Sequence, residues 1–338
     1  MQLCKQIQKL GRHGFLCGAA MLALVAGQTA WAEAATLRFG HVLPVTHPWS
    51  TCGIETLTKA LEAKPELDLQ IEVFPGGQLG SNEELVASVA AGSLDMTLPG
   101  VGSVSPYYAP FGVLEAFFAF RDLDHFDRVW NGEIGEELRK GASEAGISVI
   151  GDLWYIGMRQ ITANKPIRTP EDLKGLTMRS QDTPASFANI RSLGAQPTPI
   201  AYGELYLALS QGVVDSQENP TPNILSAKFF EVQDYLSVTN HVPQMGSLLM
   251  NKGRWDGLTD AQRAGLTEAA NAAASAVKKC ISDQEIATLD SWRKDSSMRM
   301  KVLDDVDRDA FQEAAQAFFT GPDGPGWKDL YVKVQEAQ

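Results

Sequence analysis

Residues 167–179 read Ile-Arg-Thr-Pro-Glu-Asp-Leu-Lys-Gly-Leu-Thr-Met-Arg, which is a helical start followed directly by a strand. Thr169-Pro170 places a proline at the first position of a helical turn, where its missing N–H is tolerated. Leu176-Thr177-Met178 then predicts a strand that ends at the charged side chain of Arg179. An α/β lobe is therefore expected to begin near residue 170.

The same alternation of strands and helices extends toward the N-terminus. Strands are predicted over 37–40, 69–74, 96–98 and 147–153, and helices are predicted after the loop 41–48, after residue 81 and over 126–145. Ser81 and Glu84 have the spacing of a capping box, which supports a helix start there. This alternation favours an α/β fold with mainly parallel sheets.

The stretch from Thr259 to Trp292 contains no proline and is rich in alanine. Its apolar residues recur at intervals of three and four, which predicts a single helix of roughly 50 Å at 1.5 Å per residue. A mature chain of about 300 residues also exceeds the size at which one hydrophobic core stops growing. Two lobes braced by this helix are therefore expected.

The N-terminus has the layout of a secretory signal peptide. Lys5, Lys9 and Arg12 precede the apolar run 15–25 and the small-residue triplet 30–32. We expect cleavage near residue 33 and export to the periplasm as a soluble protein. Loss of three basic residues changes the formal charge from −12 to −15, which disfavours nucleic acid as a partner.

Two cysteines, Cys52 and Cys280, remain after this cleavage. An oxidising compartment would allow them to form a disulfide. They lie far apart in the sequence, and the favoured interpretation is two small buried apolar residues.

No catalytic or cofactor motif is found in the chain. It lacks G-x-S-x-G, H-E-x-x-H, C-x-x-C, P-loop and G-x-G-x-x-G patterns. The four histidines beyond residue 33 show no spacing typical of metal ligands. We therefore expect no enzyme activity, no cofactor and no metal site.

Polar residues at the expected strand ends are candidates for ligand binding. Open α/β sheets bind ligands at the carboxyl ends of their strands. Arg179 ends one strand, and its planar guanidinium can hold a carboxylate through two parallel hydrogen bonds. Arg159 follows the aromatic stretch 154–158, Asn219 lies in Gln-Glu-Asn-Pro, and Tyr202 offers an aromatic face. Each of these side chains alone is also compatible with a purely structural role.

Several longer motifs carry a family resemblance. Six stretches of the chain resemble the DctP-type substrate-binding proteins of TRAP (tripartite ATP-independent periplasmic) transporters. They are residues 167–179, 197–209 and 214–220, Phe-Pro-Gly-Gly-Gln-Leu-Gly at 74–80, Ala-Gly-Ser-Leu-Asp-Met at 91–96 and Lys-Phe-Phe-Glu-Val-Gln at 228–233. The similarity covers nearly the whole mature chain, and the order and spacing of the motifs are specific to that family.

The resemblance implies a role for each candidate residue. Arg179 matches the arginine that clamps the ligand carboxylate, Arg159 a second arginine of the cleft, and Asn219 a hydrogen-bond donor to the same carboxylate. The other positions implied to contact the ligand are Tyr202, Thr183, Asn82, and His41 or Val42.

The resemblance also implies the architecture and the partners. The fold would be that of a type II-like periplasmic binding protein, with a cleft between two lobes and the long helix spanning both. Lobe I would comprise residues 33–156 and 245–284, and lobe II residues 157–244 and 285–338. The closed form of a monomer would deliver its ligand to a small and a large membrane subunit.

A sugar acid, either a uronate or an aldonate, is the favoured ligand. Asn82, Gln181 and Thr183 could serve its hydroxyl groups. Sialic acid is disfavoured because its binders carry charged residues near positions 100 and 103, which are Gly and Ser in this chain. A C4-dicarboxylate, an aromatic acid or a keto acid remains an alternative. A receptor that presents its ligand to a sensor kinase, or a periplasmic enzyme, remains an alternative of another class.

Overall fold

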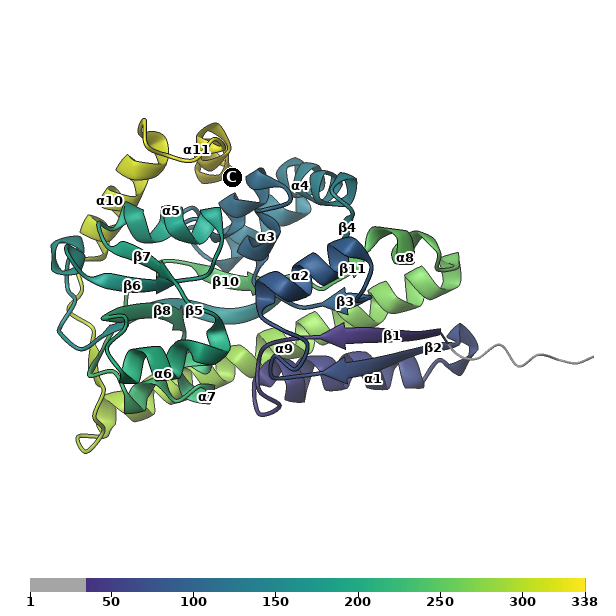
Figure 1. Ribbon diagram of the computed structural model, residues 1–338, viewed down its shortest axis with the longest axis horizontal. Coiled ribbons are helices and arrows are strands. Elements are labelled where there is room, and N and C mark those ends of the chain that lie inside the picture. The colour runs from purple at the N-terminus through teal and green to yellow at the C-terminus, as the bar shows by residue number, and fades with distance from the viewer. Residues whose placement is uncertain (1–34, 338) are drawn as a thin grey trace, which may run out of the picture. The chain divides into compact units, whose positions relative to one another are not determined.

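The computed structural model describes residues 35–337, which contain two β-sheets (Figure 1). The first is five-stranded, in the order β2-β1-β3-β11-β4, and the second is seven-stranded, in the order β12-β9-β5-β8-β6-β7 with β10 paired to β5. The strands are β1 (Ala35–Gly40), β2 (Leu69–Phe74), β3 (Met96–Thr97), β4 (Ile147–Val149), β5 (Trp154–Ala163), β6 (Thr177–Ser180), β7 (Gln196–Pro199), β8 (Ser216–Pro220), β9 (Tyr235–Ser237), β10 (Pro243–Gly246), β11 (Leu249–Asn251) and β12 (Lys301–Leu303).

Both sheets are mixed, whereas the sequence predicted mainly parallel pairing. β1 is parallel to β2 and β3, and β6 is parallel to β7 and β8. In the first sheet, β11 runs antiparallel to β3 and β4. In the second, β5 runs antiparallel to β8, β9 and β10. The antiparallel strands are those with which the chain passes from one sheet to the other, so a repeating strand-helix pattern does not reveal them.

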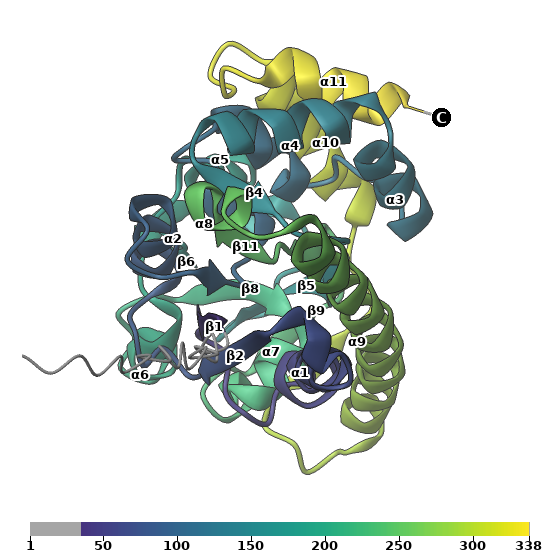
Figure 2. The ribbon, with the colours of Figure 1, turned by 90° about the vertical axis from the view of Figure 1, so that its right-hand side faces the viewer.

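Helices cover the faces of the two sheets. They are α1 (Glu55–Glu62), α2 (Asn82–Ala91), α3 (Leu123–Asn131), α4 (Glu133–Glu144), α5 (Pro184–Ser192), α6 (Leu205–Ser210), α7 (Thr221–Ser226), α8 (Lys252–Asp256), α9 (Asp260–Lys294), α10 (Arg308–Thr320) and α11 (Lys328–Glu336). In Figure 2, α10 and α11 lie beside α4 and α5, and α10 packs on α5.

The predicted long helix is confirmed as α9, which has 35 residues. Thr259 and Gln262 form a capping box at its start, which satisfies N–H groups that have no partner inside the helix. α9 contacts α1 beside the first sheet, and it contacts β5, α7 and β12 in the second half of the structure. Figure 1 shows it passing behind both sheets from the lower left to the right. The helix therefore braces the two sheets, as its length predicted.

One predicted helix, residues 126–145, is interrupted in the structure. α3 ends and α4 begins at Gly132. Glycine inside a helix costs conformational entropy, and Gly135 then lets α4 approach closely, because a Cβ there would lie 1.8 Å from the carbonyl oxygen of Trp130. The two helices therefore pack against each other at a turn instead of forming one rod.

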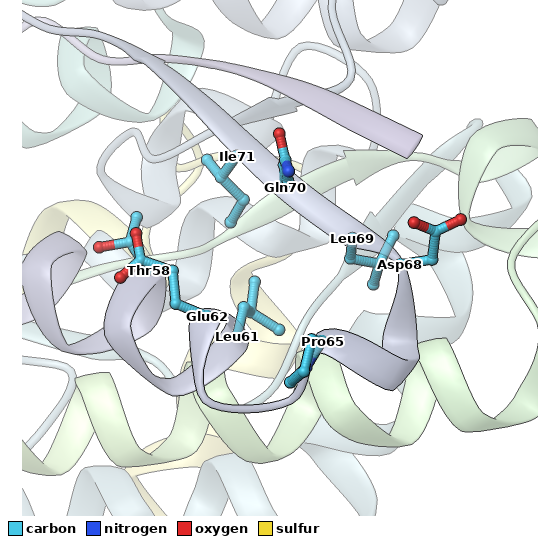
Figure 3. A pocket seen from close by; sticks show the side chains of 8 residues that line it. All are labelled: Thr58, Leu61, Glu62, Pro65, Asp68, Leu69, Gln70 and Ile71. Atoms are coloured by element: carbon cyan, nitrogen blue, oxygen red, sulfur yellow. The ribbon is translucent and has the colours of Figure 1, made fainter. Parts of the chain in front are cut away.

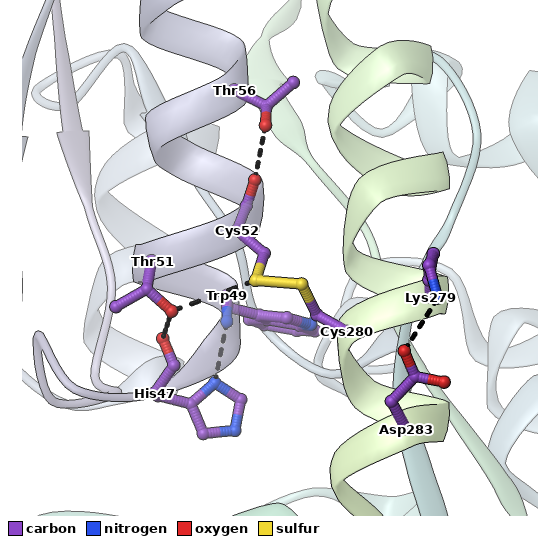
Figure 4. Close-up of a disulfide and its surroundings, with 8 residues drawn as sticks. All are labelled: His47, Trp49, Thr51, Cys52, Thr56, Lys279, Cys280 and Asp283. Carbon is purple, nitrogen blue, oxygen red and sulfur yellow. Dashed lines mark hydrogen bonds and ion pairs between the residues drawn. A yellow bond between two sulfur atoms is a disulfide. The ribbon is translucent and has the colours of Figure 1, made fainter.

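The cysteines form a disulfide, so the interpretation as two unpaired apolar residues is wrong. Cys52 lies on a π-helical segment, Trp49–Ile54, and Cys280 lies on α9 (Figure 4). Their Cα atoms are 6.6 Å apart, which is within the range that a disulfide spans. A sequence separation of 228 hid this proximity, because α9 returns to α1 only after the chain has built most of both sheets.

Candidate ligand-binding site

A small cavity of about 40 Å³ lies between the two sheets. It is lined by Val42, Leu43, Trp49, Asn82, Leu98, Gly100, Ile156, Arg159, Arg179, Gln181, Tyr202, Asn219, Asn223 and Gln244. Five of the seven predicted site residues are therefore brought together: Arg179, Arg159, Asn219, Tyr202 and Asn82. The strand ends of β6 and β8 supply two of them, because the carboxyl ends of parallel strands meet at one edge of a sheet.

The charge of Arg159 is neutralised inside the protein. Its Nε and Nη2 both donate to the carboxylate of Glu218, with Nη2 at 2.6 Å from Oε1, and Nη2 also donates to the Glu218 carbonyl. Nη1 donates to Gln244 Oε1 at 2.9 Å. His241 Nε2 lies 3.0 Å from Glu218 Oε2, so this carboxylate is held from two sides.

The pKa of Glu218 shows the same compensation. Burial alone would raise it, but Arg159 and the hydrogen bonds from His241 and Arg159 lower the pKa of Glu218 to about 2. Arg159 and Glu218 therefore form a closed ion pair, and little of the Arg159 charge remains for a ligand.

Arg179 is buried without a carboxylate partner. Its side chain is 4% exposed, and its Nε donates to the Ile200 carbonyl at 2.9 Å. Within residues 35–337, no carboxylate forms an ion pair with it. Burial, followed by the positive charge of Arg159, lowers the pKa of Arg179 to about 10. The site thus holds one cation without a carboxylate in direct contact, and a ligand carboxylate is the group that would complete it.

Amides and a phenol surround this cation. Asn219 Nδ2 donates to Gln217 Oε1 at 2.6 Å, and Asn223 Nδ2 lies 3.3 Å from Asn219 Oδ1. The Tyr202 hydroxyl donates to the Asn223 carbonyl at 3.4 Å, and burial raises the pKa of Tyr202 to about 12. Tyr202 therefore stays neutral and offers its ring to a carbon skeleton.

Thr183 and His41 are not among the residues that line the cavity. Thr183 is buried and caps α5, with its Oγ1 accepting from the Ser186 N–H at 3.1 Å. His41 is also buried, and within the described residues neither ring nitrogen has a hydrogen-bond partner. Burial lowers the pKa of His41 to about 4. For both residues, contact with the ligand stays a prediction.

Sequence reasoning missed Trp49 and Gln244 as lining residues. Trp49 Nε1 donates to the Tyr155 carbonyl at 3.0 Å, and Gly246 makes room for the ring, since a Cβ there would lie 2.0 Å from it. Gln244 comes from β10, a strand that the sequence did not reveal. Gln244 is polar and Gly246 is small, although both lie in a buried strand. This unusual composition was the sequence signal that could have indicated a binding site.

A larger cavity of about 590 Å³ lies between α1 and β2 (Figure 3). Its polar lining comes from Thr58, Glu62, Asp68 and Gln70, so it contains two carboxylates and no basic side chain. Charge repulsion makes it unsuitable for an acid. The small cavity between the sheets is therefore the better candidate.

Comparison with known proteins identifies the family. Residues 39–320 match the model of the bacterial extracellular solute-binding protein family 7, DctP. The chain belongs to this family. The resemblance inferred from the sequence is thus confirmed, and so is the two-lobe fold of TRAP periplasmic solute-binding proteins.

Three similar proteins show what DctP-family members bind. The chain is 29% identical over 320 residues to the 2,3-diketo-L-gulonate-binding periplasmic protein YiaO of Escherichia coli, which covers 93% of this chain and 96% of that protein. It is 32% identical over 257 residues to the C4-dicarboxylate-binding periplasmic protein DctP of Rhodobacter capsulatus, covering 76% and 77%. A TRAP solute-binding protein from a Polaromonas species, solved with bound D-erythronate, matches with a TM-score of 0.81 and 30% identity over 90% of this chain and 99% of that one.

DctP-family proteins of this kind are periplasmic. The predicted signal peptide, residues 1–32, lies outside the described residues. Among residues 35–337, no helix has the length and apolar character needed to cross a bilayer. The same residues contain no group of three or more His, Cys, Asp or Glu side chains that could hold a metal ion.

Proposed function

We propose that this protein captures a small sugar acid in the periplasm and delivers it to the membrane subunits of a TRAP transporter. The observation that carries the proposal is Arg179, a buried cation without a carboxylate partner beside a cavity rich in amides. The ligand carboxylate would bind Arg179, while Asn219, Asn82 and Gln181 would serve the adjoining polar groups.

The relatives support a hydroxylated acid. Diketogulonate and D-erythronate, which two of them bind, each carry a carboxylate and several oxygen functions. The Rhodobacter relative favours a C4-dicarboxylate as the second candidate. That candidate is weaker because a second carboxylate would need a second available cation, and Arg159 is already paired with Glu218.

Ligand entry requires the cavity to widen. A volume of about 40 Å³ has room for only about three water molecules at 10–15 Å³ each. A sugar acid is larger, so we infer that the lobes move apart to admit it and close around it by a hinge movement. Closure excludes water, which strengthens the contact with Arg179, although desolvation of both ions offsets part of the gain.

The finer assignments belong to the same proposal. Residues 33–156 with 245–284 would move as lobe I, and residues 157–244 with 285–338 as lobe II. The protein would act as a monomer, without catalysis, and its closed form would be recognised by one small and one large membrane subunit.

A thermal-shift screen of residues 33–338 tests the proposal. The panel contains aldonates, uronates, dicarboxylates, aromatic acids, keto acids and neutral sugars. An acid at a hundredfold excess over its dissociation constant should stabilise the folded protein by about 2.7 kcal/mol, which is a shift of several degrees. A response confined to neutral or cationic solutes would contradict the assignment of Arg179.

A further inference from the structure

Glu115 is a buried carboxyl group directly behind the wall of the small cavity. It ends the 3₁₀ segment Ala109–Glu115, its side chain is 2% exposed, and it does not itself line the cavity. Its backbone is fixed by Asn189, whose Nδ2 donates to the Glu115 carbonyl at 2.8 Å. The side chain therefore has a defined position on the side of α5.

Gly102 makes room for this carboxyl group, and Gly100 lies in ordinary contact with it. A Cβ at Gly102 would lie 1.6 Å from Glu115 Oε2, and a Cβ at Gly100 would lie 3.6 Å from Oε1. Gly100 lines the cavity, so Glu115 Oε1 lies directly behind a residue of the cavity wall. Any other residue at position 102 would displace the carboxyl group.

Glu115 has weak hydrogen bonding for a buried acid. Oε1 accepts from Gln181 Nε2 at 3.3 Å, and within the described residues Oε2 has no partner. Burial raises the pKa of Glu115, and Arg159 together with hydrogen bonding to Gln244 and Gln181 only partly opposes this effect. An unsatisfied buried carboxyl group costs stability, and such groups persist where they serve a function.

The contact with Glu115 determines how Gln181 faces the cavity. Gln181 lines the cavity two residues after Arg179, and its backbone N–H donates to Ser186 Oγ at 3.0 Å. Because Glu115 takes the amide nitrogen, the amide oxygen of Gln181 is left for the ligand. Within residues 35–337, no group donates a hydrogen bond to that oxygen.

We propose that Glu115 is a positioning residue that sets ligand selectivity by holding the Gln181 amide with its oxygen toward the cavity. This inference rests on the proposed function and narrows it. A hydroxyl group donates to an amide oxygen, whereas an ionised carboxylate has no proton to donate. The site therefore accepts a monocarboxylate with hydroxyl groups and disfavours a second carboxylate.

The test is calorimetric titration with D-erythronate, L-galactonate and succinate. The wild type should bind at least one of the two aldonates at least 100-fold more tightly than succinate. Glu115→Met removes the acceptor for Gln181 and should reduce this ratio at least tenfold. Glu115→Gln retains a carbonyl oxygen that can accept from Gln181, so its ratio should lie closer to that of the wild type. Glu313→Met, the same change at an exposed position of α10, should leave the ratio within twofold.

A double-mutant cycle separates positioning from a general loss of structure. Gln181→Met should reduce the ratio at least tenfold by itself, and Glu115→Met combined with Gln181→Met should match Gln181→Met alone within threefold. The proposal would be overturned if the reduction of the ratio in the double variant equalled the product of the two single reductions. An unchanged ratio in either single variant would also overturn it. If Glu115→Met does not fold, Gly102→Ala takes its place, because the added Cβ would displace the Glu115 carboxyl group, and an unchanged ratio in that variant would overturn the proposal.

Binding by the wild type distinguishes a failure of the role of Glu115 from a failure of the proposed function. Tight binding of succinate alone would overturn the role of Glu115 and leave the capture of an organic acid intact. Binding of none of these acids, or of any other acid in the screen, would remove the proposed function, and this inference would fail with it.

Discussion

Arg159 and Arg179 line the same cavity and have opposite energetic roles. Arg159 donates to both carboxylate oxygens of Glu218, so its burial is compensated. Arg179 is equally buried, but its only hydrogen bond within the described residues is to the Ile200 carbonyl. A buried charge without a partner lowers stability, and it binds a matching ion strongly for the same reason.

We expect Arg179→Met to lose ligand binding and gain stability. The loss of binding should be about 3–5 kcal/mol, or at least a hundredfold in affinity. Without ligand, the free energy of unfolding should rise by about 1–3 kcal/mol, because an unpaired buried charge is removed. Calorimetric titration and denaturant unfolding measure the two effects.

Arg159→Met is the matched comparison. This change leaves Glu218 buried without its cation, so the free energy of unfolding should fall by about 3–5 kcal/mol. Equal stability changes in the two variants would contradict the distinction between the two arginines.

At the scale of elements, the carboxyl group of Glu285 joins α9 to β5. The contact lies where the chain passes from the first sheet to the second. Glu285 on α9 accepts from the Met158 N–H at 2.8 Å and from the Tyr155 hydroxyl at 3.1 Å. Gly157 between them has a φ of +127°, and the pairing of β5 with β10 is irregular there. A residue with a Cβ would be strained at Gly157, so glycine is required where β5 bends between its two pairings.

Burial raises the pKa of Glu285 to about 7. The folded protein therefore binds this proton more tightly than the unfolded chain does, where the pKa is 4.5. The stabilising contribution is complete below pH 4.5 and is lost as the pH rises through 7. The loss should be at most about 3 kcal/mol.

The Glu285→Gln variant tests this assignment. Denaturant unfolding between pH 4.5 and 8 should show that the difference in the free energy of unfolding between wild type and variant changes with pH. Buried histidines affect both proteins equally, so they do not contribute to this difference. Asp283→Asn, at an exposed position of the same helix, should keep the pH dependence of the wild type. The same slope for Glu285→Gln and the wild type would refute the role of Glu285.

At the scale of the whole molecule, the Cys52–Cys280 disulfide joins the segment that carries Trp49 to α9. Trp49 lines the cavity, and the preceding His47 lies with its Nε2 3.0 Å from Asn223 Oδ1 on the opposite side of the cavity. The disulfide thus anchors one wall of the binding site to the helix that spans both sheets.

The double variant Cys52→Ser with Cys280→Ser should lower the free energy of unfolding by about 2–4 kcal/mol, because the unfolded chain regains the freedom of a closed loop. A reducing agent should lower the melting temperature of the wild type and leave that of the variant unchanged. Equal melting temperatures of oxidised wild type and variant would contradict this expectation.

Features that depend on local sequence could be predicted, and contacts distant in sequence could not. The spacing of alanines and the absence of proline predicted α9, and the position of Arg179 after a strand predicted its place in the cavity. The partner of Arg159 could not be predicted, because Glu218 comes from another strand 59 residues later. The same limitation applied to Cys280 and to Gln244, whose places depend on the return of the chain from the second sheet to the first.

Neither sheet is made from one continuous piece of chain. The first takes β11 from residues that follow most of the second sheet, and the second takes β12 from residues after α9. No single cut in a gene for this protein can therefore separate one half from the other. A cut between β4 and β5, for example, keeps every strand of the second sheet together but parts β11 from the rest of the first sheet, so an exchange of either segment between two such genes would build the first sheet from both parents.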